Sequence, residues 1–502
     1  MPGRLSLTFR TLCSLVAALS IASAQASSGP ELFVRSADAT SSACSQIEAA
    51  LSSASELSLP GLGSFYQDIG HWATSSTQQA ACSVQPGSTQ DLGKIMQIIA
   101  ATNSSFAVKG GGHTSNPGFS STTGVHISMS RFSEVTYHAE SSTVDVGSGL
   151  IWDDVYAALE PDNAMVVGGR VTGVGVAGFT LGGGYSWLTN QYGLTIDTVT
   201  GYELVLPNGT VASITDSSNP DLMFALRGGY NNFGVVTKFT LKAYPSANVW
   251  GGLITYTANT LDDVASASVN FSSKVTDPKA GIITTYNFVL GEIGVSQLLF
   301  YDAPQAPAGI FDEFLAISSF SKDVKSRTFS DLVRNIPSNA TGGTRGIFNT
   351  VSLLEYTPEL MEVIRNETQY WGQKLSLEDS GTFISYDVEP FQPTLFTHGS
   401  TSTASYPPTR SQGLLPLNLY WAYWDSSKDQ VFYDAITQSA ATIKAKAVEL
   451  GQDVADAPVY GNYAIFSTPI DKIYGGNLER LRTIKQQYDP NNVMALAGGW
   501  KI

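Results

Sequence analysis

The chain has 502 residues, and its 43 acidic side chains outnumber 28 lysines and arginines, which gives a formal charge of −15. A chain of this length is expected to form more than one hydrophobic core, and the acidic balance disfavours nucleic acid as a partner. With 43% apolar residues and no long low-complexity tract, the composition argues against a disordered protein.

The first 24 residues have the pattern of a secretory signal. Arg4 and Arg10 precede an apolar run over residues 12–21, and Ala22-Ser23-Ala24 supplies small residues for cleavage. The apolar run is too short to span a membrane, so we expect residues 1–24 to be removed and the protein to be secreted, without a membrane anchor. Acceptor sequons for glycosylation, which are consistent with secretion, begin at Asn103, Asn208, Asn270, Asn339 and Asn366.

The cysteine count also fits an oxidising compartment. Of the three cysteines, Cys13 leaves with the signal, so Cys44 and Cys82 remain as an even pair. We expect these two to form a disulfide bond.

The region up to about residue 245 is predicted to be one α+β lobe. Residues 43–57 and 85–101 have helical patterns, and Ser88 is a suitable N-cap with Asp91 three residues later. Short runs bounded by turn residues predict strands at 106–109, 125–129, 143–146, 202–206, 210–214 and 235–241, with a helix at 151–159.

Beyond Pro245 the glycine density falls and a second lobe is predicted. Its expected strands are 253–256, 282–289, 296–301, 381–386 and 417–424, and its expected helices are 307–317, 358–375 and 430–450. Strands in this order favour an antiparallel sheet with flanking helices. A last helix is predicted at 477–488.

The first of three glycine-rich stretches reads V-K-G-G-G-H-T-S-N-P-G over residues 108–118. Gly110, Gly111 and Gly112 carry no Cβ, so backbone N–H groups there can approach an anionic group closely. His113 follows at the edge of this turn. Taken alone, the stretch is equally compatible with a plain loop.

Two further stretches make a ligand site the better interpretation. Residues 168–193 read G-G-R-V-T-G-V-G-V-A-G-F-T-L-G-G-G-Y-S-W-L-T-N-Q-Y-G, and residues 227–237 read R-G-G-Y-N-N-F-G-V-V-T. A loop so dense in glycine is expected to wrap a large, flat ligand.

The order of these motifs resembles that of the vanillyl-alcohol-oxidase-type flavoproteins with a PCMH-type FAD-binding domain, and within them the berberine-bridge-enzyme-like branch. The resemblance rests on G-G-G-H, D-V-G-S-G at 145–149, the second stretch, G-G-Y-N-N-F-G-V-V-T, Y-G-N-Y at 460–463 and L-R-T-I-K-Q-Q-Y-D-P-N-N-V at 481–493. It implies an α+β fold with an FAD-binding lobe of two α/β subdomains over 25–250. A substrate lobe over 251–455, with an antiparallel sheet and flanking helices, and a C-terminal segment over 456–502 that returns to the FAD lobe complete the expected fold.

The resemblance also implies how FAD is bound. In the family, the histidine that matches His113 is bonded covalently to the C8α methyl of the flavin. The residues expected to hold the rest of the cofactor are Gly110, Gly111, Gly112, Thr114, Val174, Gly175, Gly178, Gly182, Gly183, Val236 and Asn462. Many members have a second bond through a cysteine, but the matching position here is Val171, so a single covalent bond is expected.

Two other positions bear on the reaction. Val174 matches a position where a small side chain is associated with oxygen access to the flavin, which favours an oxidase. Phe179 stands where plant members have a histidine, which leaves open what balances negative charge on the reduced flavin.

The residue that removes the substrate hydroxyl proton is not evident from any motif. The position of a plant glutamate matches Leu417, and strand alternation places Tyr423 on the same face as Leu417 and Tyr420 on the other. We name Tyr423 first, then Tyr463 and Tyr420. Asp387 and Glu389 are the alternatives.

The main functional hypothesis is a secreted FAD-dependent oxidase that oxidises an alcohol or sugar hydroxyl of a small molecule and passes electrons to molecular oxygen. A specialised-metabolite oxidoreductase and a flavin-binding protein without turnover remain alternatives. A nicotinamide-dependent dehydrogenase is disfavoured, because neither glycine loop has G-x-G-x-x-G between a strand and a helix with an acidic residue about 20 positions later.

Overall fold

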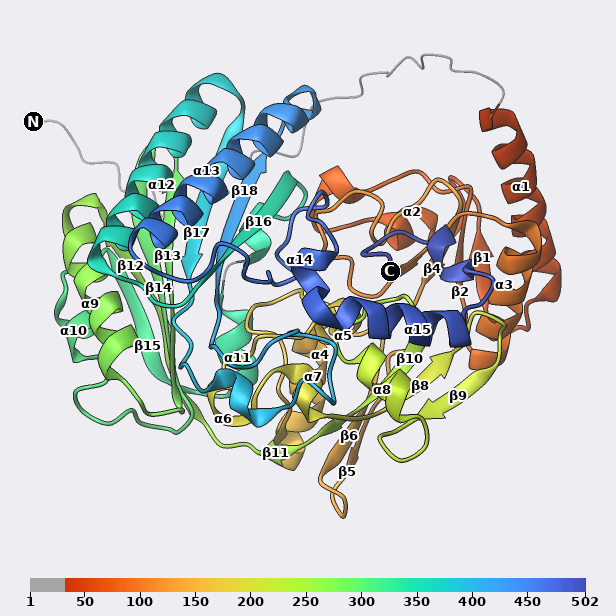
Figure 1. Ribbon diagram of the computed structural model, residues 1–502, viewed down its shortest axis with the longest axis horizontal. Helices are drawn as coiled ribbons and strands as arrows, with labels where there is room; N and C mark the ends of the chain where they lie inside the picture. The colour runs from red at the N-terminus through yellow and green to blue at the C-terminus, as the bar shows by residue number, and fades with distance from the viewer. Residues whose placement is uncertain (1–31, 337) are drawn as a thin grey trace, which may run out of the picture.

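The computed structural model describes residues 32–336 and 338–502 and shows two lobes side by side (Figure 1). The predicted signal, residues 1–24, lies outside the described residues. Within the described ranges, no helix is long and apolar enough to cross a membrane.

The first lobe begins with a four-stranded sheet in the order β1-β2-β4-β3. Its strands are β1 (Glu56–Ser58), β2 (Cys82–Gln85), β4 (Val125–Ser128) and β3 (Phe106–Lys109), and the helices α1 (Leu32–Ala50) and α3 (Thr89–Thr102) pack beside it. β4 runs parallel to both β2 and β3, so the turn after β3 leaves the same end of the sheet as the loop after β4.

The disulfide between Cys44 of α1 and Cys82 of β2 confirms the predicted pairing. Ser88 caps α3 as predicted, because its hydroxyl accepts a hydrogen bond from the Asp91 backbone N–H. The expected helix over 43–57 ends earlier, at Ala50. Beyond it, the hydroxyls of Ser52 and Ser55 donate to the Asp91 carboxylate and hold the chain in a turn.

A second sheet of five antiparallel strands completes the first lobe, in the order β5-β6-β10-β8-β9. The strands are β5 (Val135–His138), β6 (Thr143–Gly147), β10 (Val235–Lys242), β8 (Val199–Val205) and β9 (Val211–Ile214). Its core includes side chains of α4 (Trp152–Leu159), α8 (Pro220–Leu226) and α15 (Leu478–Tyr488).

The second lobe is a seven-stranded antiparallel sheet, which confirms the predicted architecture. In sheet order the strands are β15 (Ser321–Arg327), β12 (Val249–Thr257), β14 (Glu292–Tyr301), β13 (Ala280–Val289), β17 (Gly381–Val388), β18 (Leu415–Tyr423) and β16 (Arg345–Leu353). The helices α9 (Leu261–Lys274), α12 (Pro358–Glu378) and α13 (Asp429–Glu449) cover its outer face (Figure 1). The sequence did not predict β15 or β16, and the helix expected over 307–317 is shortened to α10 (Asp312–Ala316).

Several short helices and strands lie between the main sheets and long helices along the chain. They are α2 (Phe65–Ile69), β7 (Ala164–Met165), α5 (Val176–Leu181), α6 (Thr189–Tyr192), α7 (Thr195–Thr198), β11 (Tyr244–Pro245), α11 (Phe329–Arg334) and α14 (Asp471–Tyr474).

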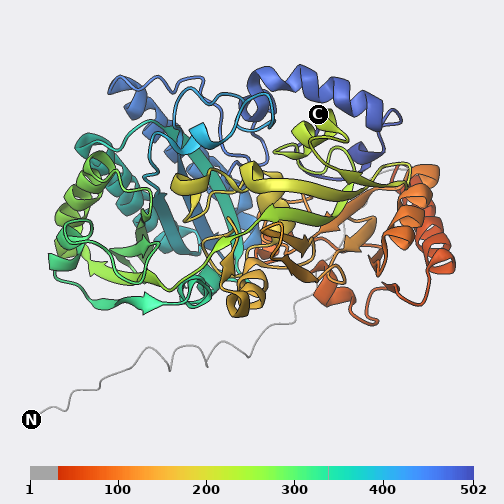
Figure 2. The same cartoon turned by 90° about the horizontal axis from the view of Figure 1, so that it is seen from below.

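After α13 the chain returns to the first lobe, where α15 lies along its outside (Figure 2). Long-range hydrogen bonds fasten this return to the first lobe: the Asn116 side-chain amide donates to the Ala464 carbonyl, and the Asn232 side-chain amide donates to the Trp500 carbonyl. The C-terminal segment therefore closes one side of the space between the lobes.

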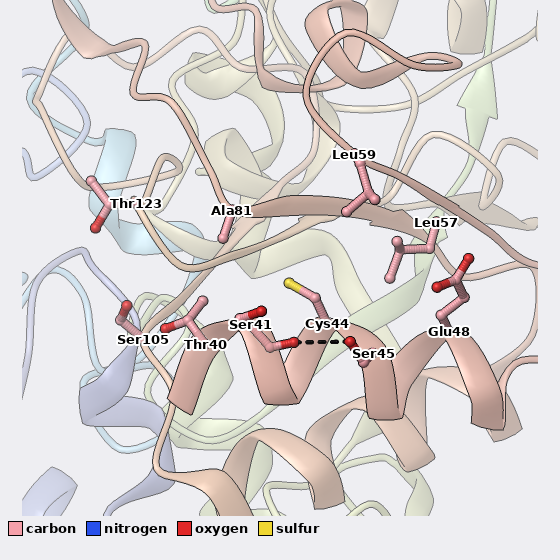
Figure 3. A pocket seen from close by; sticks show the side chains of 10 residues that line it. All are labelled: Thr40, Ser41, Cys44, Ser45, Glu48, Leu57, Leu59, Ala81, Ser105 and Thr123. Atoms are coloured by element: carbon pink, nitrogen blue, oxygen red, sulfur yellow. Dashed lines mark hydrogen bonds between the residues drawn. The ribbon is translucent and has the colours of Figure 1, made fainter. Parts of the chain in front are cut away.

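A separate surface hollow of about 360 Å³ lies beside α1 (Figure 3). Its wall consists of Thr40, Ser41, Cys44, Ser45, Glu48, Leu57, Leu59, Ala81, Ser105 and Thr123. Because Cys44 is held in the disulfide, Glu48 is the one acidic or basic side chain of this wall. The hollow therefore has no set of groups that could perform acid–base chemistry.

Candidate active site

A cavity of about 500 Å³ lies between the two lobes and the C-terminal return. The predicted cofactor residues Gly110, Gly111, Gly112, His113, Thr114, Val174, Gly175, Gly178, Val236 and Asn462 all line it. The opposite wall comes from the inner face of the seven-stranded sheet, including Thr285, Ser296, Phe348, Phe383, Ser385, Asp387, Asn418 and Tyr420. The cavity therefore joins a glycine-rich cradle to a wall of aromatic and polar side chains.

The cradle forms where two glycine loops touch. A Cβ on Gly111 would lie 2.5 Å from the Gly175 Cα, and a Cβ on Gly175 would lie 2.5 Å from the Gly111 backbone N. Gly112 has a φ of +72°, in the left-handed region. Only glycine permits this approach, which brings the backbone of both loops to one wall of the cavity.

Gly182 and Gly183 were expected to contact the cofactor, but they do not line the cavity. A Cβ on Gly182 would lie 2.2 Å from the Asn462 side-chain oxygen, and one on Gly183 would lie 3.0 Å from the ring of Tyr406. Gly182 therefore makes room for the C-terminal return and Gly183 for Tyr406 in the segment before β18, so both lie behind the cavity wall. Their contact with the cofactor stays a prediction.

His113 is partly buried at the edge of the cavity, and its Nε2 atom is shielded from solvent. Its Nε2 has no hydrogen-bond partner among the described residues, and its ring stacks on Trp72 with centroids 4.3 Å apart and planes 11° apart. Burial lowers the pKa of His113 to about 4, so the ring is neutral at physiological pH. A neutral imidazole with an unpaired nitrogen can act as a nucleophile.

These features fit FAD. The buried Nε2 of His113 is left without a partner by the described residues, as is expected of an atom that meets a bound group, and two Cβ-free loops could offer backbone N–H groups to a pyrophosphate. No cluster of histidine, cysteine or acidic side chains that could hold a metal ion occurs within residues 32–336 and 338–502.

The buried pair Arg170 and Glu389 forms a cluster with the partly buried Tyr463 on the cavity wall. Arg170 Nη2 donates to Glu389 Oε2 at 2.6 Å and to the Tyr463 hydroxyl oxygen at 2.8 Å, and that hydroxyl donates to Glu389 Oε1 at 3.0 Å. Burial raises the pKa of Glu389 to about 7, although Arg170 opposes the shift. Tyr463 was predicted at the site and lines the cavity; Arg170 was not predicted, and its position after Gly168-Gly169 was the available signal.

A row of polar residues crosses the inner face of the sheet. Strand pairing aligns Asn418 with Asp387, Asp387 with Thr285, and Thr285 with Ser296. Asn418 Nδ2 donates to Asp387 Oδ2 at 2.8 Å, while the Asn418 side-chain oxygen has no partner among the described residues. Burial raises the pKa of Asp387 above its ordinary value, although the hydrogen bond from Asn418 opposes the shift.

The prediction that Tyr423 takes the substrate proton is wrong. Its ring stacks on Phe432 of α13 with centroids 3.9 Å apart, and its hydroxyl donates to Asp429, so it lies on the outer face of the sheet. Leu417 is buried on that same face. The residues of β18 that face the cavity are Asn418 and Tyr420.

Tyr420 does line the cavity, as one of an aromatic group with Trp72 and Phe348. Burial raises the pKa of Tyr420 to about 12, which makes it a poor proton acceptor at neutral pH. Tyr420 therefore offers its aromatic ring, rather than its hydroxyl, for contact with a molecule in the cavity. Val236 and Asn462, which were predicted to contact the cofactor, line the cavity, and the Asn462 amide donates to the Phe179 carbonyl and the Tyr460 hydroxyl.

Comparisons with known proteins identify the class. Residues 80–215 match the FAD binding domain family, and residues 459–497 match the berberine and berberine-like family. The FAD-dependent monooxygenase drtC of Aspergillus calidoustus is 32% identical over 447 residues, which cover 86% of this chain and 84% of that protein.

Two solved structures share the fold. Physcomitrella patens BBE-like 1 superposes with a TM-score of 0.74 at 18% identity, covering 90% of this chain and 97% of that one. The carbohydrate oxidase from Microdochium nivale superposes with a TM-score of 0.74 at 19% identity, covering 89% and 98%. The chain belongs to the berberine-bridge-enzyme-like family of FAD-linked oxidoreductases with a PCMH-type FAD-binding domain. It is therefore a flavoenzyme.

Proposed function

We propose that the protein is a secreted oxidase that oxidises a hydroxyl-bearing carbon of a small molecule and transfers the electrons to molecular oxygen, giving hydrogen peroxide. The observation that supports this most is the hydrogen bond from Tyr463 to Glu389 in the same cavity as the glycine cradle. Oxidation of a hydroxyl by hydride transfer needs a proton acceptor next to the cofactor.

In this proposal the two glycine loops hold the FAD pyrophosphate, and His113 bonds covalently to the flavin. FAD supplies the hydride acceptor and the route of electrons to oxygen. The neutral imidazole of His113 and its stacking on Trp72 support the bond, because the ring is held in one plane with a nitrogen free. Val171 offers no thiol for a second bond.

The proton of the substrate hydroxyl goes to the Tyr463 and Glu389 pair. A carboxyl group with a pKa of about 7 is well matched to accept a proton near neutral pH. Asp387 lies further along the same sheet and is placed to accept a hydrogen bond from a second substrate hydroxyl.

The substrate is a small molecule that presents both a flat apolar surface and hydroxyl groups. Phe348, Phe383 and Tyr420 offer aromatic surface, while Asp387 and Asn418 offer polar atoms. A saccharide fits this wall, as does an aromatic specialised metabolite. The carbohydrate oxidase neighbour favours the first class, and the monooxygenase relative favours the second.

The test is anaerobic mixing of purified holoenzyme with two panels, oligosaccharides and hydroxylated aromatic compounds, followed by flavin absorbance. Bleaching by a member of either panel, then one peroxide per oxidised molecule on admission of oxygen, is the expected result. If an oxygen atom from labelled molecular oxygen appeared in the product, the protein would be a monooxygenase and the proposed oxidase activity would be wrong. Absence of bleaching by every compound would favour a flavin-binding protein without turnover.

Secretion is a separate part of the proposal and rests on the pattern of residues 1–24 together with the Cys44–Cys82 bond. Protein recovered from culture medium is expected to lack these residues by N-terminal sequencing. Recovery of full-length chain only from inside the cells would contradict this part.

A further inference from the structure

The cluster of Arg170, Glu389 and Tyr463 has a closed pattern of hydrogen bonds. Arg170 Nη2 donates to Glu389 Oε2 and to the Tyr463 hydroxyl oxygen, and the Tyr463 hydroxyl donates to the second carboxylate oxygen of Glu389. Arg170 is 7% exposed and Glu389 is 2% exposed, so bulk water screens this pair little. A change of charge on one partner therefore acts strongly on the other.

The charges around the cavity make Arg170 distinctive. Among the described residues of the cavity wall, Arg170 is the one lysine or arginine, Asp387 and Glu389 are the acids, and His113 is neutral. Arg170 also belongs to the second glycine loop, four residues before Val174 in the cradle. It is thus the positive charge that the chain places between the cradle and the proton acceptor.

We propose that Arg170 and Glu389 act as a charge switch in which protonation of Glu389 releases the Arg170 charge to balance the negative charge that the flavin gains on reduction. The proposal rests on the oxidation of a hydroxyl proposed above. It assigns Arg170 as a positioning and charge-compensating residue of that reaction.

The step is balanced. The substrate C–H bond would break with its electron pair and hydrogen passing as hydride to the bound flavin, while the O–H bond would break and a C=O bond would form. The proton passes to the Tyr463 oxygen as the Tyr463 proton moves to Glu389 Oε1, 3.0 Å away. Substrate is oxidised, flavin is reduced by two electrons, and the carboxylate becomes a neutral acid that no longer compensates Arg170.

The titration of Glu389 supports this order of events. Burial raises its pKa to about 7, so the carboxyl group can exist in either state near neutral pH. The groups that face Glu389 are Arg170, Tyr463, Asp387, Tyr356, Tyr460 and Tyr185. Of these, Arg170 alone is cationic, so the ion pair with Arg170 is the contact that weakens when Glu389 takes a proton.

The same sheet provides a matched control on its outer face. Arg345 there pairs with Asp429, and the Tyr423 hydroxyl donates to Asp429 at 2.8 Å, so an arginine, a carboxylate and a tyrosine again meet. None of the three lines the cavity. Substitutions at Asp429 thus report the general effect of breaking such a cluster without touching the site.

The experiment measures the midpoint potential of the protein-bound flavin between pH 5.5 and 9, with no substrate present. The variants are Glu389→Gln, Arg170→Met, Arg170→Lys and the control Asp429→Asn. In the unmodified enzyme, the potential is expected to fall more steeply with pH above about 7, because reduction then draws a proton onto Glu389. Glu389→Gln is expected to lose this steeper fall and to keep a higher potential at pH 8–9.

Arg170→Met is expected to shift the potential downward at every pH, with partial recovery in Arg170→Lys, while Asp429→Asn follows the unmodified enzyme. A potential in Glu389→Gln that keeps the steeper fall overturns the proposal, as does an unchanged potential in Arg170→Met. If Arg170→Met does not fold, Glu389→Gln alone decides. Since no substrate is used, a failure here is distinct from a failure of any compound to bleach the flavin.

Discussion

At the residue scale, His113 shows how packing prepares one side chain for chemistry. Trp72 stacks on its ring, and the Trp72 backbone N–H donates to the Gly112 carbonyl at 3.0 Å. The ring and the turn that carries it are thus held by the same neighbour. Burial keeps the imidazole neutral, which leaves a lone pair available for a bond to the flavin.

His113→Ala is expected to abolish acid-stable flavin, because no other nucleophile is expected at this position of the turn. The measurement is flavin absorbance in the pellet after acid precipitation. Retention of coloured pellet in His113→Ala would contradict a bond at this residue, and release of all flavin by acid from the unmodified protein would contradict any covalent bond.

Trp72→Leu is expected to slow covalent attachment while leaving flavin binding intact. Stacked aromatic pairs contribute about 0.5–1.5 kcal/mol, enough to change the fraction of time that the His113 ring is correctly oriented. In-gel fluorescence of denatured protein during reconstitution with FAD reports the covalent fraction. Trp424→Leu, at an indole that is 57% exposed, serves as the control, and equal rates in both variants would contradict the role of Trp72.

Tyr463→Phe is expected to lower the rate of flavin reduction by roughly 10²–10⁴-fold, because the hydrogen-bonded path to Glu389 is cut. Tyr423→Phe, on the outer face of the sheet, is expected to keep the unmodified rate. The rate of flavin reduction in both variants is measured by stopped-flow mixing with a substrate found in the two panels. A normal rate in Tyr463→Phe would transfer the role of proton acceptor to Asp387.

At the element scale, the segment around residues 72–76 connects the two lobes. Thr74 N–H donates to the Thr344 carbonyl, just before β16, and the Ser75 hydroxyl donates to the Gly346 carbonyl within β16. β16 is an edge strand, so this segment covers backbone groups that would otherwise be unpaired. The same segment carries Trp72, which contacts His113 and Gly112. The turn with His113 is therefore linked to the cavity wall that the seven-stranded sheet forms.

The Cys44–Cys82 bond fastens α1 to the first sheet across 38 residues. Its removal by Cys44→Ala with Cys82→Ala is expected to lower the free energy of unfolding by about 4 kcal/mol, because the unfolded chain gains loop entropy. Urea unfolding of the two proteins measures the difference. A loss below about 1 kcal/mol, or free thiols in unreduced protein, would contradict this stabilisation.

At the scale of the whole molecule, several buried groups tie stability to pH. Burial lowers the pKa of His71 to about 4, that of His113 to about 4 and that of His126 to about 3. The unfolded chain binds protons at these sites below about pH 6.5, so their contribution to stability is present above that pH and is lost as the pH falls toward 4. Glu389 acts in the opposite sense, because its raised pKa gives stability at low pH that is lost as the pH rises through about 7.

The balance favours lower stability in acid. As the pH falls from 7 to 5, each of these histidines is expected to lower the free energy of unfolding by about 2 kcal/mol. Glu389 is expected to raise it by a similar amount over the same interval. His126→Asn is expected to reduce the loss of unfolding free energy over this pH interval by about 2 kcal/mol. His138→Asn, at an exposed histidine, is the control, and an equal pH dependence in both variants would contradict the assignment.

Local patterns in the sequence determined much of this protein. Glycine runs mark Cβ-free turns wherever the chain folds, and Gly110 to Gly112 and His113, predicted to hold the cofactor, line one wall of the cavity. The pairing of two remaining cysteines and the cap of α3 follow from equally local rules. The antiparallel second lobe followed from the spacing of its strands.

Only the tertiary structure decided which face of β18 meets the cavity. Alternation divides the strand into two sets, but the choice between Tyr420 and Tyr423 depends on α12 and α13, which cover the outer face. It also decided the partners of Arg170, which lie 219 and 293 residues away along the chain. Contacts between such distant segments depend on how the lobes and the C-terminal return pack, and no local pattern in the sequence records that.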